Sequence, residues 1–143
     1  MRCLAGRCDL VRVELTSGAV TTLARSGLSS PYAHPRVSPD GRTIVAARQR
    51  EGQWRLVALD ADGSNERLLG PDDGAARFDA AFLPDGRTLV LTSTRGGIPN
   101  LELLDLSTGE VRPFTRTLGA AVAPAPGPDG EVFFLALHSR GWD

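Results

Sequence analysis

Two histidines are the side chains best suited to acid–base or metal chemistry in this sequence. His34 precedes Pro35 at the start of one apolar segment, and His138 ends another segment near the end of the chain. An imidazole near neutral pH can carry a proton or bind a metal ion. Because no further histidine and no ligand motif accompany them, we interpret both as solvated loop residues. A joint metal or acid–base site is the alternative.

Three regularly spaced arginines form a second candidate site. Arg50, Arg95 and Arg140 each follow a Pro-Asp-Gly tripeptide at similar spacing and lie close to a glycine. A guanidinium binds carboxylates through paired hydrogen bonds. The interpretation we favour is structural, with each arginine bound to loop carbonyls or to an acid of a neighbouring repeat. The functional alternative is a cationic partner-binding face, shared with His34 and His138, that holds an acidic peptide or protein.

Motifs of the common enzyme classes are missing from the sequence. It contains no G-x-S-x-G, H-E-x-x-H, G-x-x-x-x-G-K-[ST] or G-x-G-x-x-G, which mark serine hydrolases, zinc peptidases, P-loop proteins and dinucleotide-binding proteins. The aspartates of the three Pro-Asp-Gly tripeptides are turn formers by chemistry. We therefore predict a non-enzymatic chain with no catalytic residue, no cofactor and no metal.

The overall charge excludes one further class of partner. The chain has 143 residues and a formal net charge of −1, and all sixteen basic residues are arginines. The basic surface expected of a nucleic-acid-binding protein is therefore not predicted. No apolar run approaches the ~20 residues that a membrane helix needs. We predict neither a nucleic-acid partner nor membrane insertion.

Cys3 and Cys8 are the only cysteines. Their C-x4-C spacing does not match the C-x2-C pattern of zinc knuckles and redox motifs, and no second pair is present. We interpret them as two independent thiols near the chain terminus. A disulfide across a hairpin in an oxidising compartment is an alternative, and metal binding is a third.

An internal repeat must position all these side chains. Pro-Asp-Gly occurs at Pro39-Asp40-Gly41, Pro84-Asp85-Gly86 and Pro128-Asp129-Gly130, at intervals of 45 and 44 residues. In such a tripeptide proline presets φ, aspartate bonds to the nearby backbone and glycine adopts the positive φ that closes a hairpin. Short Val-, Leu- and Thr-rich segments follow each tripeptide, without a helical period. Each unit therefore predicts four antiparallel strands, A to D, and the all-β fold of a β-propeller.

One repeat family matches these motifs. Ser38-Pro39-Asp40-Gly41-Arg42, with the segment 56–69, resembles the TolB-type, WD-like propeller repeat, and Pro84-Asp85-Gly86-Arg87 with the segment 93–106 resembles it too. The resemblance implies a propeller fold. Such blades occur in periplasmic Tol-system proteins and in the propeller domains of prolyl-oligopeptidase-like peptidases. The departures are Leu83 and Gly127, where the pattern prefers serine.

The repeat predicts a partial β-propeller over residues 1–143, with about three four-stranded antiparallel blades. Residues 8–25 supply strands C and D of a first blade, 33–70 and 77–116 form complete blades, and 120–143 supply strands A and B of a last one. Propellers close with roughly four to eight blades. We therefore expect a piece of a six- to eight-bladed ring from a longer protein, with self-association through open blade edges as a consequence. The alternative is that two copies of this chain close a six-bladed ring.

The function expected from these observations is a non-enzymatic scaffold of TolB-like type that binds a protein or peptide partner. The D–A and B–C loops lie at the same end of every blade and would form the binding face. The alternative is the gating propeller of a prolyl-oligopeptidase-class serine peptidase whose catalytic domain lies elsewhere. In either case the resemblance implies a longer, exported protein of the periplasm or the extracellular space.

Overall fold

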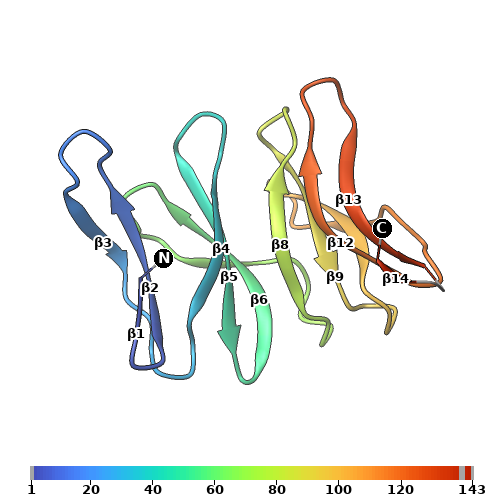
Figure 1. The fold of residues 1–143 in the computed structure, drawn as a ribbon, viewed down its shortest axis with the longest axis horizontal. Coiled ribbons are helices and arrows are strands. Elements are labelled where there is room, and N and C mark those ends of the chain that lie inside the picture. Colours follow the sequence, from blue (N-terminus) through green and yellow to red (C-terminus); the bar gives the residue numbers. More distant parts are fainter. Residues whose placement is uncertain (1, 139–140, 143) are drawn as a thin grey trace.

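Four antiparallel sheets follow one another in chain order along the long axis of the molecule (Figure 1). The computed structural model describes residues 2–138 and 141–142. In the sheets, the strands are β1 (Arg2–Leu4), β2 (Arg7–Val13) and β3 (Val20–Ala24); β4 (Tyr32–Val37), β5 (Thr43–Arg50), β6 (Gln53–Asp60) and β7 (Arg67–Leu69); β8 (Arg77–Phe82), β9 (Thr88–Ser93), β10 (Asn100–Asp105) and β11 (Val111–Pro113); and β12 (Ala120–Pro126), β13 (Val132–His138) and β14 (Gly141–Trp142).

This arrangement confirms the predicted all-β fold of antiparallel four-stranded sheets. The two central sheets each pair their strands in chain order, β4-β5-β6-β7 and β8-β9-β10-β11. Each terminal sheet has a third strand beyond the two that the repeat predicts, because β1 pairs with β2 and β14 pairs with β13. Across the described ranges, no helix is long and apolar enough to cross a membrane.

The Pro-Asp-Gly tripeptides form the turns that join the first two strands of a sheet, as predicted. Gly41, Gly86 and Gly130 all have positive φ. The Asp85 carboxylate accepts hydrogen bonds from the backbone N–H groups of Arg87 and Thr88, at 2.9 and 2.8 Å. Such side-chain to backbone bonds stabilise the turn locally. The hairpins are therefore encoded within a few residues of each tripeptide.

Both faces of each central sheet are buried, which explains why their strands are almost continuously apolar. Alternate side chains of a strand point to opposite faces. In β5, Val45 and Ala47 pack toward the β8–β11 sheet, whereas Ile44 and Ala46 pack toward the first sheet. A third apolar cluster joins the β8–β11 sheet to β12 through Ala121. Stacking of neighbouring sheets thus supplies the core.

The first strand of each later sheet contains a bulge at the same repeat position. The pairing register shifts between Ala33 and Arg36 in β4, between Phe78 and Ala81 in β8, and between Val122 and Ala125 in β12. Inside these bulges His34, Asp79 and Ala123 have φ values of 50°, 52° and 54°. A bulge bends the strand and changes the direction of a side chain. These bulges therefore alter where His34 and Asp79 point.

A disulfide joins Cys3 and Cys8. The two residues face each other directly in the β1–β2 pair, with Cα atoms 4.0 Å apart. Our preferred interpretation of two independent thiols is therefore wrong, and the hairpin disulfide is correct. The reason is the pairing of Arg2–Leu4 with Arg7–Val13, which brings the two Cβ atoms within the reach of one S–S bond.

Candidate functional site

One end of the β8–β11 sheet gathers most of the polar chemistry of the chain. Arg77 at the start of β8 and Asn100 at the start of β10 both lie opposite Ser93, the last residue of β9. The loop after β9 and the loop after β11 therefore emerge at this same end. It is the B–C and D–A loop end on which a binding face was predicted.

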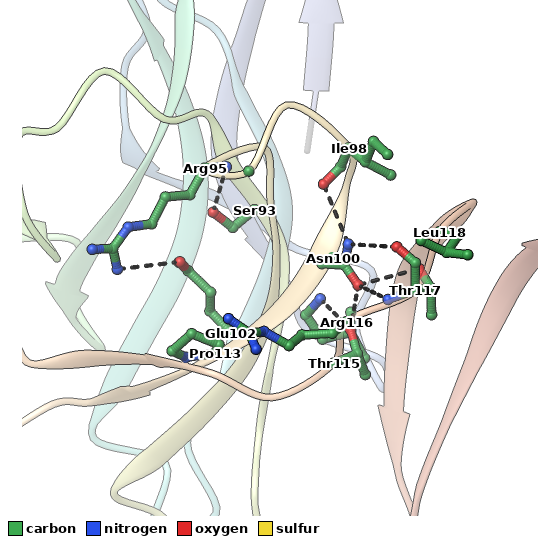
Figure 2. A pocket seen from close by; sticks show the side chains of 12 residues that line it. Ser93, Arg95, Ile98, Asn100, Glu102, Pro113, Thr115, Arg116, Thr117 and Leu118 are labelled. Carbon is green, nitrogen blue, oxygen red and sulfur yellow. Dashed lines mark hydrogen bonds and ion pairs between the residues drawn. The ribbon is translucent and has the colours of Figure 1, made fainter.

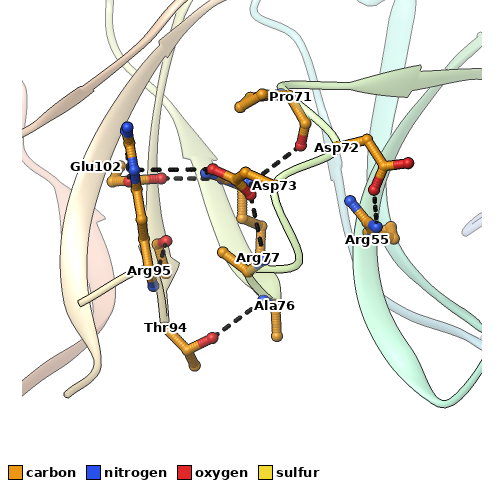
Figure 3. A network of polar contacts seen from close by, with 11 residues as sticks. Arg55, Pro71, Asp72, Asp73, Ala76, Arg77, Thr94, Arg95 and Glu102 are labelled. Atoms are coloured by element: carbon orange, nitrogen blue, oxygen red, sulfur yellow. Dashed lines mark hydrogen bonds and ion pairs between the residues drawn. The ribbon is translucent and has the colours of Figure 1, made fainter. Parts of the chain in front are cut away.

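A buried ion-pair network forms the base of this end (Figure 3). Arg77, only 2% exposed, donates from Nε to Glu102 Oε2 at 2.9 Å. It also donates from Nη1 and Nη2 to the two carboxylate oxygens of Asp73, at 2.8 and 2.9 Å. Such paired, charge-assisted bonds compensate the loss of hydration of the buried charges. The sequence repeat did not point to Arg77, because no other repeat has an arginine at that position.

Hydrogen bonding shifts the pKa values of Asp73 and Arg77 in this network. The bonds from Arg77 are the largest cause that holds the pKa of Asp73 well below its usual range. Burial alone would lower the pKa of Arg77, but its bonds to Asp73 and Glu102 outweigh burial and raise it. The arginine and its Asp73 partner therefore stay charged across the neutral range.

Arg95 lies outside the buried network and extends it toward solvent. Its guanidinium is 3.8 Å from both Asp73 Oδ2 and Glu102 Oε1, and its side chain is 52% exposed. These distances are too long for hydrogen bonds. Arg95 therefore keeps its donors available, with the two acids nearby.

A hollow of about 460 Å³ lies between Arg95 and the loop that follows β11 (Figure 2). Asn100 holds this loop, because its Oδ1 accepts hydrogen bonds from the Thr115 hydroxyl and the Thr117 N–H, both at 2.9 Å. Arg116 lies on the same loop, is exposed and has no ion-pair partner among the described residues. Ile98 and Leu118, 42% and 99% exposed, supply apolar surface at the rim. The hollow thus combines two accessible guanidinium groups with apolar side chains.

Arg50, the counterpart of Arg95 in the preceding sheet, is engaged differently. Its Nη2 is 2.7 Å from Glu66 Oε1, and Glu66 also contacts Arg48 and the Tyr32 hydroxyl. Burial raises the pKa of Glu66, but the hydrogen bonds from Tyr32, Arg50 and Arg48 outweigh it and lower that pKa overall. Arg50 therefore shares a neutralising carboxylate, whereas Arg95 has only distant contacts.

The remaining predicted residues do not converge. His34 lies on β4 and contacts Asp79 of β8, whereas His138 ends β13, with the β8–β11 sheet between the two histidines. Arg140 lies outside the described residues. No cluster of three or more metal-ligating side chains occurs in the described part of the chain. The sequence reasoning also missed Arg116 and Asn100, since neither belongs to a repeated motif.

Comparison with curated proteins finds TolB. The chain is 36% identical over 77 residues to the Tol-Pal system protein TolB of Anaeromyxobacter dehalogenans (strain 2CP-C), and 37% identical over 73 residues to that of Anaeromyxobacter sp. (strain K). The matched segments cover 54% and 51% of this chain but only 18% and 17% of those proteins. The chain thus spans less than a fifth of the length of these relatives. No protein-family model matches the chain.

Solved structures give the same result for the fold. TolB from Acinetobacter baumannii superposes with a TM-score of 0.77 over 92% of this chain and 32% of that protein, at 20% identity. A puromycin hydrolase mutant complexed with PGG superposes with a TM-score of 0.64 over 81% of this chain and 20% of that one, at 25% identity. The antiparallel sheets are therefore β-propeller blades. More particularly, the chain is a TolB-like β-propeller region.

Proposed function

We propose that this propeller region binds a protein or peptide partner and contributes no catalytic group. The observation that carries the proposal is the hollow at the B–C and D–A loop end of the β8–β11 sheet. There, Arg116, which has no ion-pair partner within residues 2–138, and the half-exposed Arg95 flank the exposed Ile98 and Leu118. Arginine beside apolar surface is typical of protein interfaces.

The two guanidinium groups and the apolar rim of the hollow indicate which class of partner it would bind. Arg95 lies 3.8 Å from Asp73 and from Glu102 and is 52% exposed, so its guanidinium is accessible to a ligand. Two guanidinium groups favour a carboxylate, which each can bind through paired hydrogen bonds. The apolar rim favours aliphatic neighbours of that carboxylate. The expected ligand is an acidic residue flanked by apolar residues in an extended segment.

A peptide titration followed by NMR tests this proposal. A blocked Leu-Asp-Leu tripeptide should bind at least tenfold more tightly than its Leu-Asn-Leu counterpart, since only the former presents a carboxylate. Arg116→Gln should remove this preference. Arg42→Gln, which alters an exposed arginine of a Pro-Asp-Gly turn, should leave the preference unchanged. Equal binding of the two peptides to the wild-type chain would refute the proposed site.

A second candidate is the propeller of a serine peptidase. The superposition on puromycin hydrolase over 81% of this chain supports it. In that case the full-length protein would carry a G-x-S-x-G segment outside these residues. Both candidates imply that this region alone does not hydrolyse chromogenic esters or Xaa-Pro amides. The neighbouring gene sequence distinguishes the two.

We also propose that the full-length protein works in the periplasm or outside the cell. The similarity to a Tol-Pal system protein supports this location. The Cys3–Cys8 disulfide supports it independently, because such bonds persist in oxidising compartments. Protection of both thiols from alkylation in protein isolated from its native host, before reduction, tests the proposal.

A further inference from the structure

A second hollow, of about 260 Å³, lies between the β4–β7 and β8–β11 sheets, where the first strands of both sheets bulge. His34, Trp54, Phe78 and Asp79 line it. Their strands β4, β6 and β8 all begin at the B–C and D–A loop end. This hollow therefore belongs to the same end of the molecule as the Arg95–Arg116 hollow, one sheet earlier.

The bulges bring one carboxylate to this hollow. His34 and Asp79 occupy the same repeat position, with φ values of 50° and 52°, and a bulge changes the direction of the side chains at that position. His34 Nδ1 lies 3.1 Å from Asp79 Oδ1, and the Asp79 side chain is 22% exposed. No other partner of the Asp79 carboxylate is found among the described residues. One carboxylate oxygen thus contacts the His34 imidazole, and the other can accept a hydrogen bond from a ligand.

Two aromatic rings complete the walls. Trp54 and Phe78 are partly buried and pack against the core cluster between the two central sheets, which fixes their positions. Aromatic faces attract cations, and tryptophan does so most strongly. Their surfaces also pack well against the aliphatic stem of a long basic side chain. The size of the hollow is below the roughly 300–1,000 Å³ of sites for drug-sized ligands, so it suits a single side chain.

From this geometry we infer that the His34–Trp54–Phe78–Asp79 hollow binds a cationic side chain, arginine or lysine, of a peptide or protein partner. Asp79 is the counter-ion and the rings hold the stem, while His34 is a positioning residue that orients the carboxylate. The inference deepens the proposed function and rests on it for the nature of the partner. Together, the two hollows would bind a basic residue (at Asp79) and an acidic residue (at Arg95 and Arg116) of the same partner.

The test uses small probes that separate this hollow from the other one. In NMR titrations, N-acetyl-arginine amide should shift the Trp54 indole signal, and its neutral analogue N-acetyl-citrulline amide should bind at least tenfold more weakly. Asp79→Asn should reduce arginine binding to the citrulline level, because asparagine keeps the shape and tolerates the positive φ. Glu51→Gln removes an exposed charge from the nearby β5–β6 turn and should leave binding unchanged.

The probes also distinguish the failure of this inference from the failure of the proposed function. If Leu-Asp-Leu binds through Arg116 while arginine and citrulline amides bind equally, the cation-binding hollow at Asp79 is refuted and the carboxylate-binding hollow at Arg116 stands. If arginine amide binds through Asp79 while Leu-Asp-Leu and Leu-Asn-Leu bind equally, the carboxylate-binding hollow is refuted and the cation-binding hollow stands. The comparison of arginine with citrulline needs only the wild-type chain, so it decides the matter even if Asp79→Asn does not fold.

Discussion

The first residue of β4 and the first residue of β8 occupy corresponding repeat positions, and both are buried polar side chains of different type. Tyr32 begins β4 and Arg77 begins β8, and both are at least 97% buried. Each contacts an acid of its own repeat: Tyr32 contacts Glu66, which precedes β7, and Arg77 contacts Glu102 of β10. A buried polar group is costly unless it is hydrogen-bonded. The burial of Tyr32 and of Arg77 therefore depends on the acid partner of each.

The ionisation of Tyr32 should report its burial directly. Burial, aided by the bond to Glu66, raises the pKa of Tyr32 to about 12, compared with about 10 in an unfolded chain. The stability that this shift contributes is therefore complete below pH ~10 and is lost as the pH rises to ~12. Tyr32 is the only tyrosine, so phenolate absorbance follows it alone. The midpoint should fall to about 10 in urea, and a native midpoint already near 10 would contradict the prediction.

Arg77 should be among the residues most important for stability. Arg77→Met leaves the Glu102 carboxylate, which is only 4% exposed, without its buried partner. The expected loss is about 3–5 kcal/mol of unfolding free energy. The double variant Arg77→Met/Glu102→Leu should recover most of it, because it also removes the buried Glu102 charge, while Asp73, the other partner of Arg77, is 27% exposed and keeps contact with water. Denaturant unfolding measures all three proteins.

The surface ion pair between Arg87 and Asp105 provides the control for that experiment. Its side chains are 60% and 31% exposed, and exposed pairs contribute about 0–1 kcal/mol. Arg87→Gln should therefore change the unfolding free energy by less than about 1 kcal/mol. If Arg87→Gln and Arg77→Met lost a similar amount of unfolding free energy, burial of the ion pair would not be the cause of the loss in Arg77→Met.

At the scale of elements, turns do more than join strands, because some of them pack against the preceding sheet. The turn between β6 and β7 contains Gly63, whose φ is +89°. A Cβ atom at this position would lie 2.2 Å from the carbonyl oxygen of Leu23 in β3. Gly109, in the corresponding turn of the next sheet, has a φ of +73° and open space around it. The two glycines therefore share a backbone requirement but differ in tertiary contact.

Alanine substitutions at these two glycines should separate the two effects. Gly109→Ala carries only the cost of a non-glycine residue at positive φ, about 1 kcal/mol. Gly63→Ala adds a backbone clash with β3 and should cost about 2–4 kcal/mol in total. Thermal and denaturant unfolding of both variants provide the comparison. Equal losses would show that the first sheet moves away from the turn without penalty.

At the scale of the whole molecule, the sheets at the two ends leave apolar side chains uncovered. On β13, Phe133 and Leu135 are 64% and 51% exposed, and in the first sheet Val13 and Val20 are 51% and 56% exposed. In the central sheets the corresponding faces are buried by a neighbouring sheet. Large uncovered apolar patches mark interfaces or sites of aggregation.

We therefore expect the 143-residue chain to self-associate, with β13 of one copy contacting another copy. Light scattering after size exclusion should give a mass above that of the 15.2 kDa monomer. Phe133→Lys/Leu135→Lys, which places charge on one face of β13, should shift the population toward the monomer. The control Arg42→Gln should not. A monodisperse wild-type monomer at micromolar concentration would contradict the expectation.

The blade repeat can be predicted from the sequence, because the information that encodes it is local. Pro-Asp-Gly specifies a hairpin turn within four residues, and the apolar segments between turns specify strands buried on both faces. These features predicted the turn at Pro39-Asp40-Gly41, the four-stranded sheets and the end of the molecule at which Arg50 and Arg95 lie. None of this required knowledge of contacts between distant residues.

The candidate sites, in contrast, could not be predicted from the sequence, because they are built from contacts between distant residues. Asp73, Arg77 and Glu102 converge from a loop and two strands, and His34 meets Asp79 across two sheets. Such contacts depend on strand twist, on the bulges and on the stacking of neighbouring sheets, which no local motif specifies. For the same reason the repeat alone did not distinguish the neutralised Arg50 from the available Arg95. That difference arises because Glu66 lies within hydrogen-bonding distance of Arg50, whereas the acids near Arg95 are bound to Arg77.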